Sequence, residues 1–332
     1  MKKSIPIYLL VPVYILLPVV MAFLLSSCEH KELCYGHTHT AKVNVVFDWK
    51  KAPDASPESM DLYLFSEKGG TPLRYQFAGC KGGTISLPPG TYRAICLNSD
   101  TETSLYRGVG EFETFEVYTR EASLLATMDG GFRSTREPPR AEGTETERVM
   151  LSPEMVWSDK ANYDGAFTLT VNAGHAASET EQTFVLTPGQ SVCTYTVTVL
   201  NAENLQYAKS LSGTLSGMSS GYLPGLGEPS GCEQCIVPFP LNSDGISTLT
   251  GEFHTFGECS LATHQLVIYA VLADGSGWIY TYDVTKQVRT AKYPLRVDII
   301  VSGLPLPKPI TNGNGFHPDV DDWNDVHITL PM

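Results

Sequence analysis

The sequence lacks long tracts of clustered lysine and arginine, and basic residues are scarce overall. Its 332 residues contain 23 Lys and Arg against 36 Asp and Glu, giving a formal net charge of −13 at pH 7. Binding to a nucleic-acid backbone needs a concentrated positive surface. The composition therefore argues against nucleic acid as a partner.

Several catalytic signatures are also missing. The sequence contains no Walker loop, no H-E-x-x-H pair and no Ser-x-x-Lys pattern, which are the marks of phosphate-binding, zinc-dependent and serine-lysine sites. We predict no catalytic residue, no cofactor and no metal ligand, and we expect the protein not to be an enzyme.

Helical periodicity is rare, and short alternating apolar segments bounded by Gly, Pro, Asn and Asp recur instead. Cys193–Leu200 shows the clearest alternation, with Tyr195, Val197 and Val199 on one face. A period of two is typical of half-buried strands. Because strands are not interleaved with helices, the pattern predicts an all-β fold with antiparallel β-sandwich architecture.

Other strands are predicted along most of the chain, at 42–49, 60–65, 83–87, 91–98, 112–117, 167–172, 182–186, 251–256, 264–272, 278–284 and 293–300. The Gly- and Ser-rich stretch 213–231 is predicted to be a long loop. Asp274-Gly275-Ser276-Gly277 predicts a hairpin turn.

The length and one break in the pattern predict the domain organisation. At roughly 100–200 residues per domain, two domains are expected. Residues 131–149 are polar, proline-bearing and aperiodic, which is typical of a linker or exposed loop. We therefore expect a signal peptide at 1–27, one β-sandwich domain at 28–130, a linker at 131–149 and a second β-sandwich domain at 150–332.

The N-terminus has the layout of a bacterial lipoprotein signal. Lys2 and Lys3 precede a long apolar run that ends in Leu25-Ser26-Ser27-Cys28. A small residue before the cysteine admits the signal peptidase, and the cysteine sulfur then takes a diacylglyceryl group. The run is about long enough to span a bilayer, but its three prolines suit a cleaved segment better. Cys28 is the predicted lipidation site, which makes the membrane a partner and the outer membrane the expected location.

The other seven cysteines fit a chain outside the cytoplasm, with at least one thiol left unpaired. Cys232-Glu233-Gln234-Cys235 is a C-x-x-C pair. A redox motif should open a helix and a zinc site needs two further ligands, and neither condition is met. A loop disulfide between Cys232 and Cys235, or two local thiols, is the interpretation that remains. Cys96 is predicted to be a small core residue.

Two polar clusters invite a metal interpretation that the sequence does not support. His37 and His39 lie on one side of a strand pattern without an evident third ligand. The run 319–325 has four carboxylates, and Ca²⁺ favours oxygen-rich loops. It lacks the glycine and the closing glutamate of an EF-hand, so a solvated acidic turn before a last strand is expected.

Motifs at both ends resemble a family of Bacteroides-type lipoproteins that carries a domain of unknown function. The shared features are the Cys28 start with its His-x-His segment, Val45-Val46-Phe47-Asp48-Trp49, the Leu87-Pro88-Pro89-Gly90-Thr91-Tyr92 turn, and Val320–Val326. More distantly, the chain is similar to anchor and accessory lipoproteins of Bacteroidales fimbriae. That resemblance implies two transthyretin-like sandwiches and subunits that join by strand addition, a form of β-augmentation.

The resulting hypothesis is a non-catalytic, surface-facing lipoprotein that anchors or caps a fimbria-like assembly. A glycan-binding surface lipoprotein is the alternative, because aromatic side chains can stack on sugar rings. Its candidate aromatics are Trp157, Tyr163, Tyr222 and Trp278. A cell-surface hydrolase is the third hypothesis, and a deep pocket with perturbed acids would be its sign.

Overall fold

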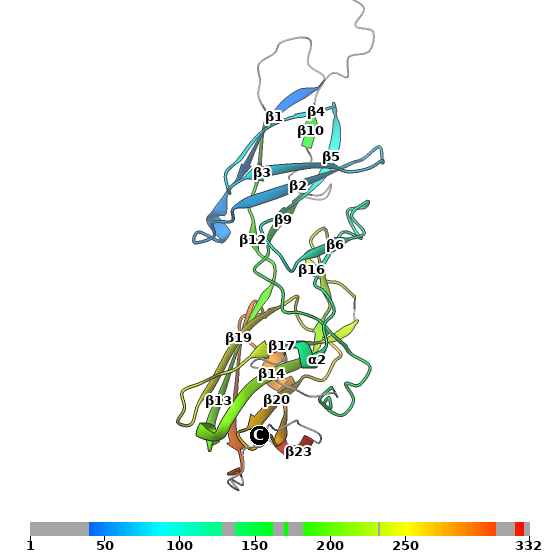
Figure 1. Ribbon diagram of the computed structural model, residues 1–332. Helices are drawn as coiled ribbons and strands as arrows, with labels where there is room; N and C mark the ends of the chain where they lie inside the picture. The colour runs from blue at the N-terminus through cyan, green and yellow to red at the C-terminus, as the bar shows by residue number, and fades with distance from the viewer. Residues whose placement is uncertain are drawn as a thin grey trace, which may run out of the picture. The chain divides into compact units, whose positions relative to one another are not determined.

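A computed structural model describes residues 40–127, 137–161, 169–171, 182–231, 233–309 and 323–328. These residues form five β-sheets (Figure 1). Helices within them are short: α2 (Leu124–Thr127), α3 (Thr285–Arg289) and two 3-10 turns. None of the helices in these ranges is long and apolar enough to cross a membrane. The predicted all-β class is confirmed.

The first sandwich packs a three-stranded sheet, ordered β11-β1-β4, against a larger sheet, ordered β12-β9-β5-β2-β3, in which β10 also pairs with β5. Its strands are β1 (Ala41–Phe47), β2 (Ser59–Ser66), β3 (Leu73–Ala78), β4 (Gly82–Leu87), β5 (Gly90–Asn98), β9 (Trp157–Ala161), β10 (Leu169–Val171), β11 (Gln182–Leu186) and β12 (Gly189–Gln190). One buried cluster unites inward residues of both sheets, including Val43, Val45, Leu62 and Leu64.

The first sandwich draws strands from beyond the predicted domain boundary. β9 pairs antiparallel with β5, and β11 pairs parallel with β1 along Val43–Phe47. β9, β10, β11 and β12 therefore belong to the first sandwich, whereas the sequence places the second domain from residue 150. Alternation shows that a segment is a strand, but it carries no information about which sheet the strand joins.

The second sandwich packs a four-stranded sheet, ordered β18-β19-β13-β22, against a six-stranded sheet, ordered β23-β21-β20-β14-β17-β8. Its strands are β8 (Arg148–Val149), β13 (Cys193–Glu203), β14 (Ala208–Ser219), β17 (Gln234–Pro240), β18 (Asn242–Ser243), β19 (Leu249–Thr255), β20 (Gln265–Leu272), β21 (Gly277–Asp283), β22 (Arg296–Pro305) and β23 (Trp323–Ile328). Pairing is mostly antiparallel, but β8, β22 and β23 pair parallel with their neighbours.

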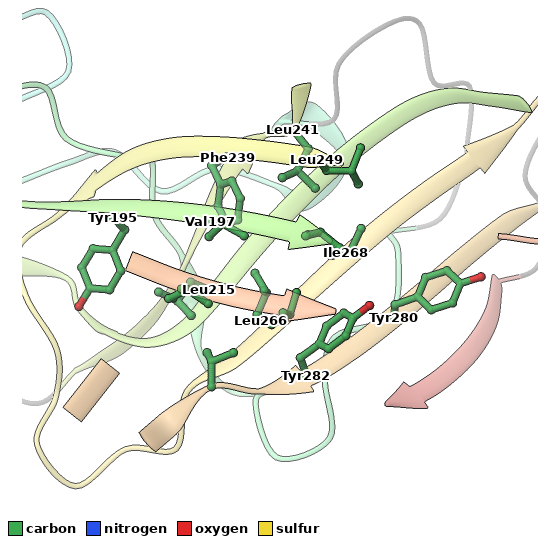
Figure 2. Close-up of a cluster of buried hydrophobic side chains, with 14 of the residues drawn as sticks. Tyr195, Val197, Leu215, Phe239, Leu241, Leu249, Leu266, Ile268, Tyr280 and Tyr282 are labelled. Atoms are coloured by element: carbon green, nitrogen blue, oxygen red, sulfur yellow. The ribbon is translucent and has the colours of Figure 1, made fainter. Parts of the chain in front are cut away.

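The core of the second sandwich confirms the alternation of β13. Tyr195, Val197 and Val199 are at most 2% exposed and meet Leu266 and Ile268 from the facing sheet (Figure 2). Burial of each such side chain contributes about 1.5–3 kcal/mol relative to leaving it in water.

The predicted loop at 213–231 is wrong over its first part, because β14 runs through it to Ser219. Glycine is required in this strand by aromatic packing. A Cβ on Gly213 would lie 2.4 Å from the Phe239 ring, and a Cβ on Gly251, in β19 of the facing sheet, would lie 2.9 Å from the same ring. Phe239 in turn stacks on Phe253 with ring centroids 4.1 Å apart. A glycine inside a strand can mark such a close approach.

A smaller sheet, ordered β16-β15-β7-β6, uses β6 (Leu105–Arg107), β7 (Glu116–Tyr118), β15 (Gly221–Leu223) and β16 (Glu228–Pro229). Phe112, predicted to lie in a strand, precedes β7 and is buried with Phe115 and Val117. Aromatic residues of β2 join this cluster, with the Tyr63 and Phe115 rings 4.8 Å apart.

The second half of the predicted linker packs closely on the six-stranded sheet. β8 pairs with Cys235 and Ile236 at the edge of β17, and Ala141 is buried against Tyr269. Glu147 is 6% exposed and accepts a hydrogen bond from the Gly217 N–H at 2.9 Å. Residues 139–150 therefore cover a sheet edge, which differs from the exposed loop that their polar composition indicates.

We expect stability to fall with rising pH because of Glu147. Burial raises the pKa of Glu147 to about 7, although the Gly217 N–H and the charge of Arg140 oppose the shift. Between the ordinary value of 4.5 and about 7 the folded state holds more protons than the unfolded state, so the free energy of unfolding decreases through this range. Glu147→Gln should flatten this dependence and stabilise the protein by about 1–3 kcal/mol at pH 8.

Urea unfolding of both proteins at pH 5 and pH 8 measures this effect. Glu142→Gln is the matched control, because Glu142 is an exposed neighbour in the same segment. Equal pH slopes for the wild type and Glu147→Gln would show that Glu147 does not titrate abnormally.

Candidate partner-binding edge

β22 forms a long edge of the four-stranded sheet. It pairs parallel with β13 on one side and ends the strand order on the other. Val297, Ile299 and Val301 point into the core and are at most 2% exposed. The alternate residues face solvent, so the register of β22 is fixed by its buried side.

At the edge of β22 that faces away from β13, backbone groups form hydrogen bonds with a side chain and not with another strand. Gln287 in α3 donates from Nε2 to the Ile300 carbonyl at 3.0 Å and accepts the Ile300 N–H at Oε1 at 2.8 Å. The side-chain amide thus occupies the place that the peptide group of an added strand would take. Because backbone groups alternate in direction along a strand, the N–H and C=O of Asp298 and Ser302 point to the same edge.

Exposed apolar residues gather along this part of the chain. Tyr293, Leu295 and Ile300 are 61%, 45% and 54% exposed. Leu200 of β13 pairs in register with Ser302 and is also exposed on the outer face beside Ile300. A free strand edge beside exposed apolar side chains has the properties needed for strand addition.

Some other strands have a covering group at their edge. β8 covers part of β17, and β23 pairs with β21 over Gly277–Tyr282. On β4, the Tyr75 hydroxyl donates to the Ser86 carbonyl at 2.8 Å. Covering edges in these ways is a common protection against unwanted pairing. We take β22 as the candidate site because it is a ten-residue strand at the end of its sheet with exposed apolar residues beside it.

The sequence-predicted sites do not converge on this edge. Cys28 and Cys232 lie outside the described residues, so lipidation and the Cys232–Cys235 disulfide stay predictions. Cys235 is a buried thiol within β17, and burial raises its pKa. Cys96 is fully buried in β5, which confirms it as a core residue.

The glycan-binding aromatics do not form an exposed platform where they are described. Trp157 is half-buried and meets Trp49 edge-on, with ring centroids 6.2 Å apart. Trp278 is half-buried against the core of the second sandwich. Tyr222 is half-buried against the cluster that contains Phe115 and Val117. Tyr163 lies outside the described residues.

Metal sites are not seen in the part of the chain that the structure describes, where no group of three His, Cys, Asp or Glu side chains could hold an ion. The His37 and His39 pair and residues 319–322 lie outside that part. Asp325 of the acidic run lies on β23 and pairs with His327 at 3.4 Å.

One pattern that the sequence analysis overlooks is Gly217-Met218-Ser219-Ser220-Gly221, which fits G-x-S-x-G. A nucleophile elbow needs a serine between a strand and a helix, beside a histidine. Here the Ser219 hydroxyl donates to the Gly221 and Ser230 carbonyls. The segment continues from one strand to the next, and this geometry gives Ser219 a structural role.

The nearest histidine is engaged elsewhere. The two ring nitrogens of His264 contact the Ser216 carbonyl at 3.1 Å and Glu258 Oε2 at 2.9 Å. The pattern therefore presents no serine–histidine pair.

The profile of a family described as a domain of unknown function, DUF5119, matches residues 27–241. A Bacteroides ovatus protein whose assigned name is that of a fimbrium anchoring subunit, Fim4B, is 24% identical over 204 residues. The match covers 61% of this chain and 53% of that protein, so the chain spans about half the length of this relative.

Comparison with solved structures shows the fold of one of them and a weaker likeness to another. A Bacteroides ovatus structure described as an adhesin is 20% identical and has a TM-score of 0.58, covering 81% of this chain and 94% of that one. The fimbrial anchor protein Mfa2 from Porphyromonas gingivalis is 13% identical with a TM-score of 0.47, covering 79% and 90%.

Proposed function

The chain belongs to the DUF5119 family, and from its similarity to a protein named as a fimbrium anchoring subunit we propose that it is an anchor or accessory subunit of a fimbria-like assembly. It joins neighbouring subunits by accepting a strand along β22. The observation that carries this proposal is the pair of hydrogen bonds between the Gln287 side-chain amide and both backbone groups of Ile300, one donated by Gln287 and one donated by the Ile300 N–H.

The lipid on Cys28 holds the protein in the outer membrane, facing the cell surface. Each CH₂ of the three acyl groups that enters the membrane contributes about 0.8 kcal/mol of binding free energy, which makes anchoring of the protein durable. The strand edge then lies on a protein that cannot diffuse away, as an anchor requires.

Affinity purification of the tagged, lipidated protein from its own membrane, with mass spectrometry of what accompanies it, tests the proposal. Recovery of fimbrial-type subunits supports the anchor role. Recovery of a glycan-uptake porin, or binding to a polysaccharide array without a protein partner, would favour the glycan-binding alternative.

Gln287 should limit access to the β22 edge, because an added strand must displace its side chain. Gln287→Ala removes two competing hydrogen bonds, worth roughly 1 kcal/mol net, and should raise the affinity for the partner about fivefold. Ile300→Pro should abolish binding, because proline lacks the N–H that faces the free edge. The variant should still fold, because proline is tolerated on an edge strand where the missing N–H would face solvent.

Quantitative recovery of the partner measures both effects. Lys286→Ala is the matched control, since Lys286 is an exposed neighbour of Gln287 in α3. If Gln287→Ala and Ile300→Pro both bind like the wild type, the partner uses another edge.

A further inference from the structure

A small pocket lies beside the β7 strand, away from the β22 edge. Its volume is about 140 Å³, and eight residues line it: Arg107, Tyr118, Thr119, Arg120, Glu121, Arg148, Met150 and Ser220. They come from β6, β7 and the segment after it, from β8 and the residue that follows it, and from the turn between β14 and β15. The space suits a few waters or the carboxylate group of a small molecule.

Arginine is concentrated around this pocket, although the chain as a whole is acidic. Three of the eight lining residues are arginines and one is a glutamate, whereas acidic residues outnumber basic ones 36 to 23 overall. Glu116 and Glu233 pair with Arg107 and Arg148, so an anion in the pocket must compete with these carboxylates or bind through Arg120.

The three arginines differ in how firmly they are held. Arg107 binds Glu116 through two hydrogen bonds, from Nε at 2.5 Å and from Nη2 at 2.8 Å. Burial would raise the pKa of Glu116, but hydrogen bonds from Arg107 and Ser230 and the charge of Arg148 hold it below its ordinary value. Arg107 is therefore held by an ionised carboxylate and is not available to bind another anion.

Arg148 and Arg120 are more available. Arg148 pairs with Glu233, whose side chain is 69% exposed, and an exposed pair contributes only about 0–1 kcal/mol. Arg120 is exposed, and within the described ranges no ion pair is recorded for its guanidinium. Both can turn toward an anion at little cost.

Ser220 supplies an independent sign of a ligand. It is 2% exposed and lines the pocket, and its Oγ has no hydrogen-bond partner. A buried hydroxyl without a partner costs about 1–3 kcal/mol, and native proteins leave few such groups. The Oγ itself is shielded from water, so a ligand oxygen in the pocket would satisfy it once the Ser220 side chain rotates toward the pocket.

We propose that this pocket binds a small carboxylate anion, with Arg120 and Arg148 on its two oxygens and the Ser220 hydroxyl donating from the buried end. The planar guanidinium fork matches a carboxylate in two parallel hydrogen bonds. Glu121 opposes the anion from the rim and limits its affinity. The site is independent of strand addition at β22.

Titration of the purified full-length protein with acetate and with D-glucuronate, followed by calorimetry, tests the proposal. D-Glucose is the neutral ligand control, and sulfate tests the choice of oxyanion. We expect saturable binding of both carboxylates that weakens with added salt, no binding of glucose, and weaker binding of sulfate.

Variants distinguish binding in this pocket from non-specific attraction of anions to arginine. Arg120→Ala and Ser220→Ala should each weaken acetate binding about tenfold, since each removes a hydrogen bond to a charged group. Glu121→Gln should strengthen it several-fold. Arg296→Ala is the matched control, because Arg296 is an exposed arginine on β22.

Ser220→Ala also reports on folding. Because its hydroxyl is unpaired without ligand, this variant should be as stable as the wild type or more stable, so loss of binding will not reflect unfolding. Absence of saturable acetate binding, or equal affinities in Arg120→Ala, Ser220→Ala and the wild type, would overturn the proposal. Sulfate binding as tight as acetate would overturn the selectivity for carboxylates.

Discussion

Replacing Cys28 by alanine should move the protein from the membrane fraction to the soluble fraction almost completely. The variant cannot receive a lipid, and once the predicted signal at 1–27 is removed no helix of the described residues is long and apolar enough to cross a bilayer. One acyl chain alone gives only marginal membrane binding, and three give durable binding. A protein that has lost all three should therefore not be divided between the membrane and soluble fractions. Fractionation of cells and immunoblotting measure the distribution.

Cys34→Ala is the matched control for this prediction. Cys34 lies six residues beyond Cys28 but outside the lipoprotein signal, so its variant should stay in the membrane fraction. If the Cys28→Ala protein remained membrane-bound, the apolar run before it would be acting as an uncleaved span.

Gly213→Val should destabilise the second sandwich by about 3 kcal/mol, near the upper end of the usual cost of overpacking. Even a Cβ at this position would lie 2.4 Å from the Phe239 ring. The ring cannot retreat, because it is 3% exposed and stacks on Phe253 at 4.1 Å. Urea unfolding measures the change.

Gly110→Val is the control, since a Cβ on Gly110 meets nothing within 4 Å. Combining Gly213→Val with Phe239→Leu should recover part of the loss, because the smaller side chain makes room for the valine. Two glycine variants of equal stability would contradict the close packing of β14 against Phe239.

The β14 strand shows where sequence patterns fail for this fold. Strands such as β13 and β20 are predicted because each places branched or aromatic residues on the core side. β14 is central to its sheet yet consists largely of Gly, Ser and Ala, which are typical of loops. Gly213 is explained by Phe239, a contact that lies 26 residues away in sequence, and Gly217 by its close approach to Thr263 and His264.

The domain boundary fails for a related reason. Ala141 is a single small apolar residue among polar neighbours, and Val149 begins a run of only three apolar residues, so periodicity cannot show that they are buried. Likewise, nothing in the alternation of residues 182–186 indicates that β11 returns to pair with β1. Strand order is fixed by long-range packing, which a single sequence does not display.

No sequence pattern predicts the candidate sites at the β22 edge and in the pocket. Gln287 is one polar residue in a five-residue helix, and its role appears only when Ile300 is seen beside it. Arg120, Arg148 and Ser220 come from three separate segments. By contrast, Cys28 was predicted from four consecutive residues, because a processing enzyme reads that signal locally.

Photo-crosslinking from position 300 in cells tests the central claim most directly. A photoreactive amino acid replaces Ile300 in the lipidated protein, and a second protein carries it at Ile246, which is 78% exposed in the turn between β18 and β19, at the opposite end of the strand order from β22. The account predicts a crosslink to a fimbrial-type subunit from position 300 and none from position 246. Crosslinks to no protein from position 300, or equal crosslinks from both positions, would contradict strand addition at β22.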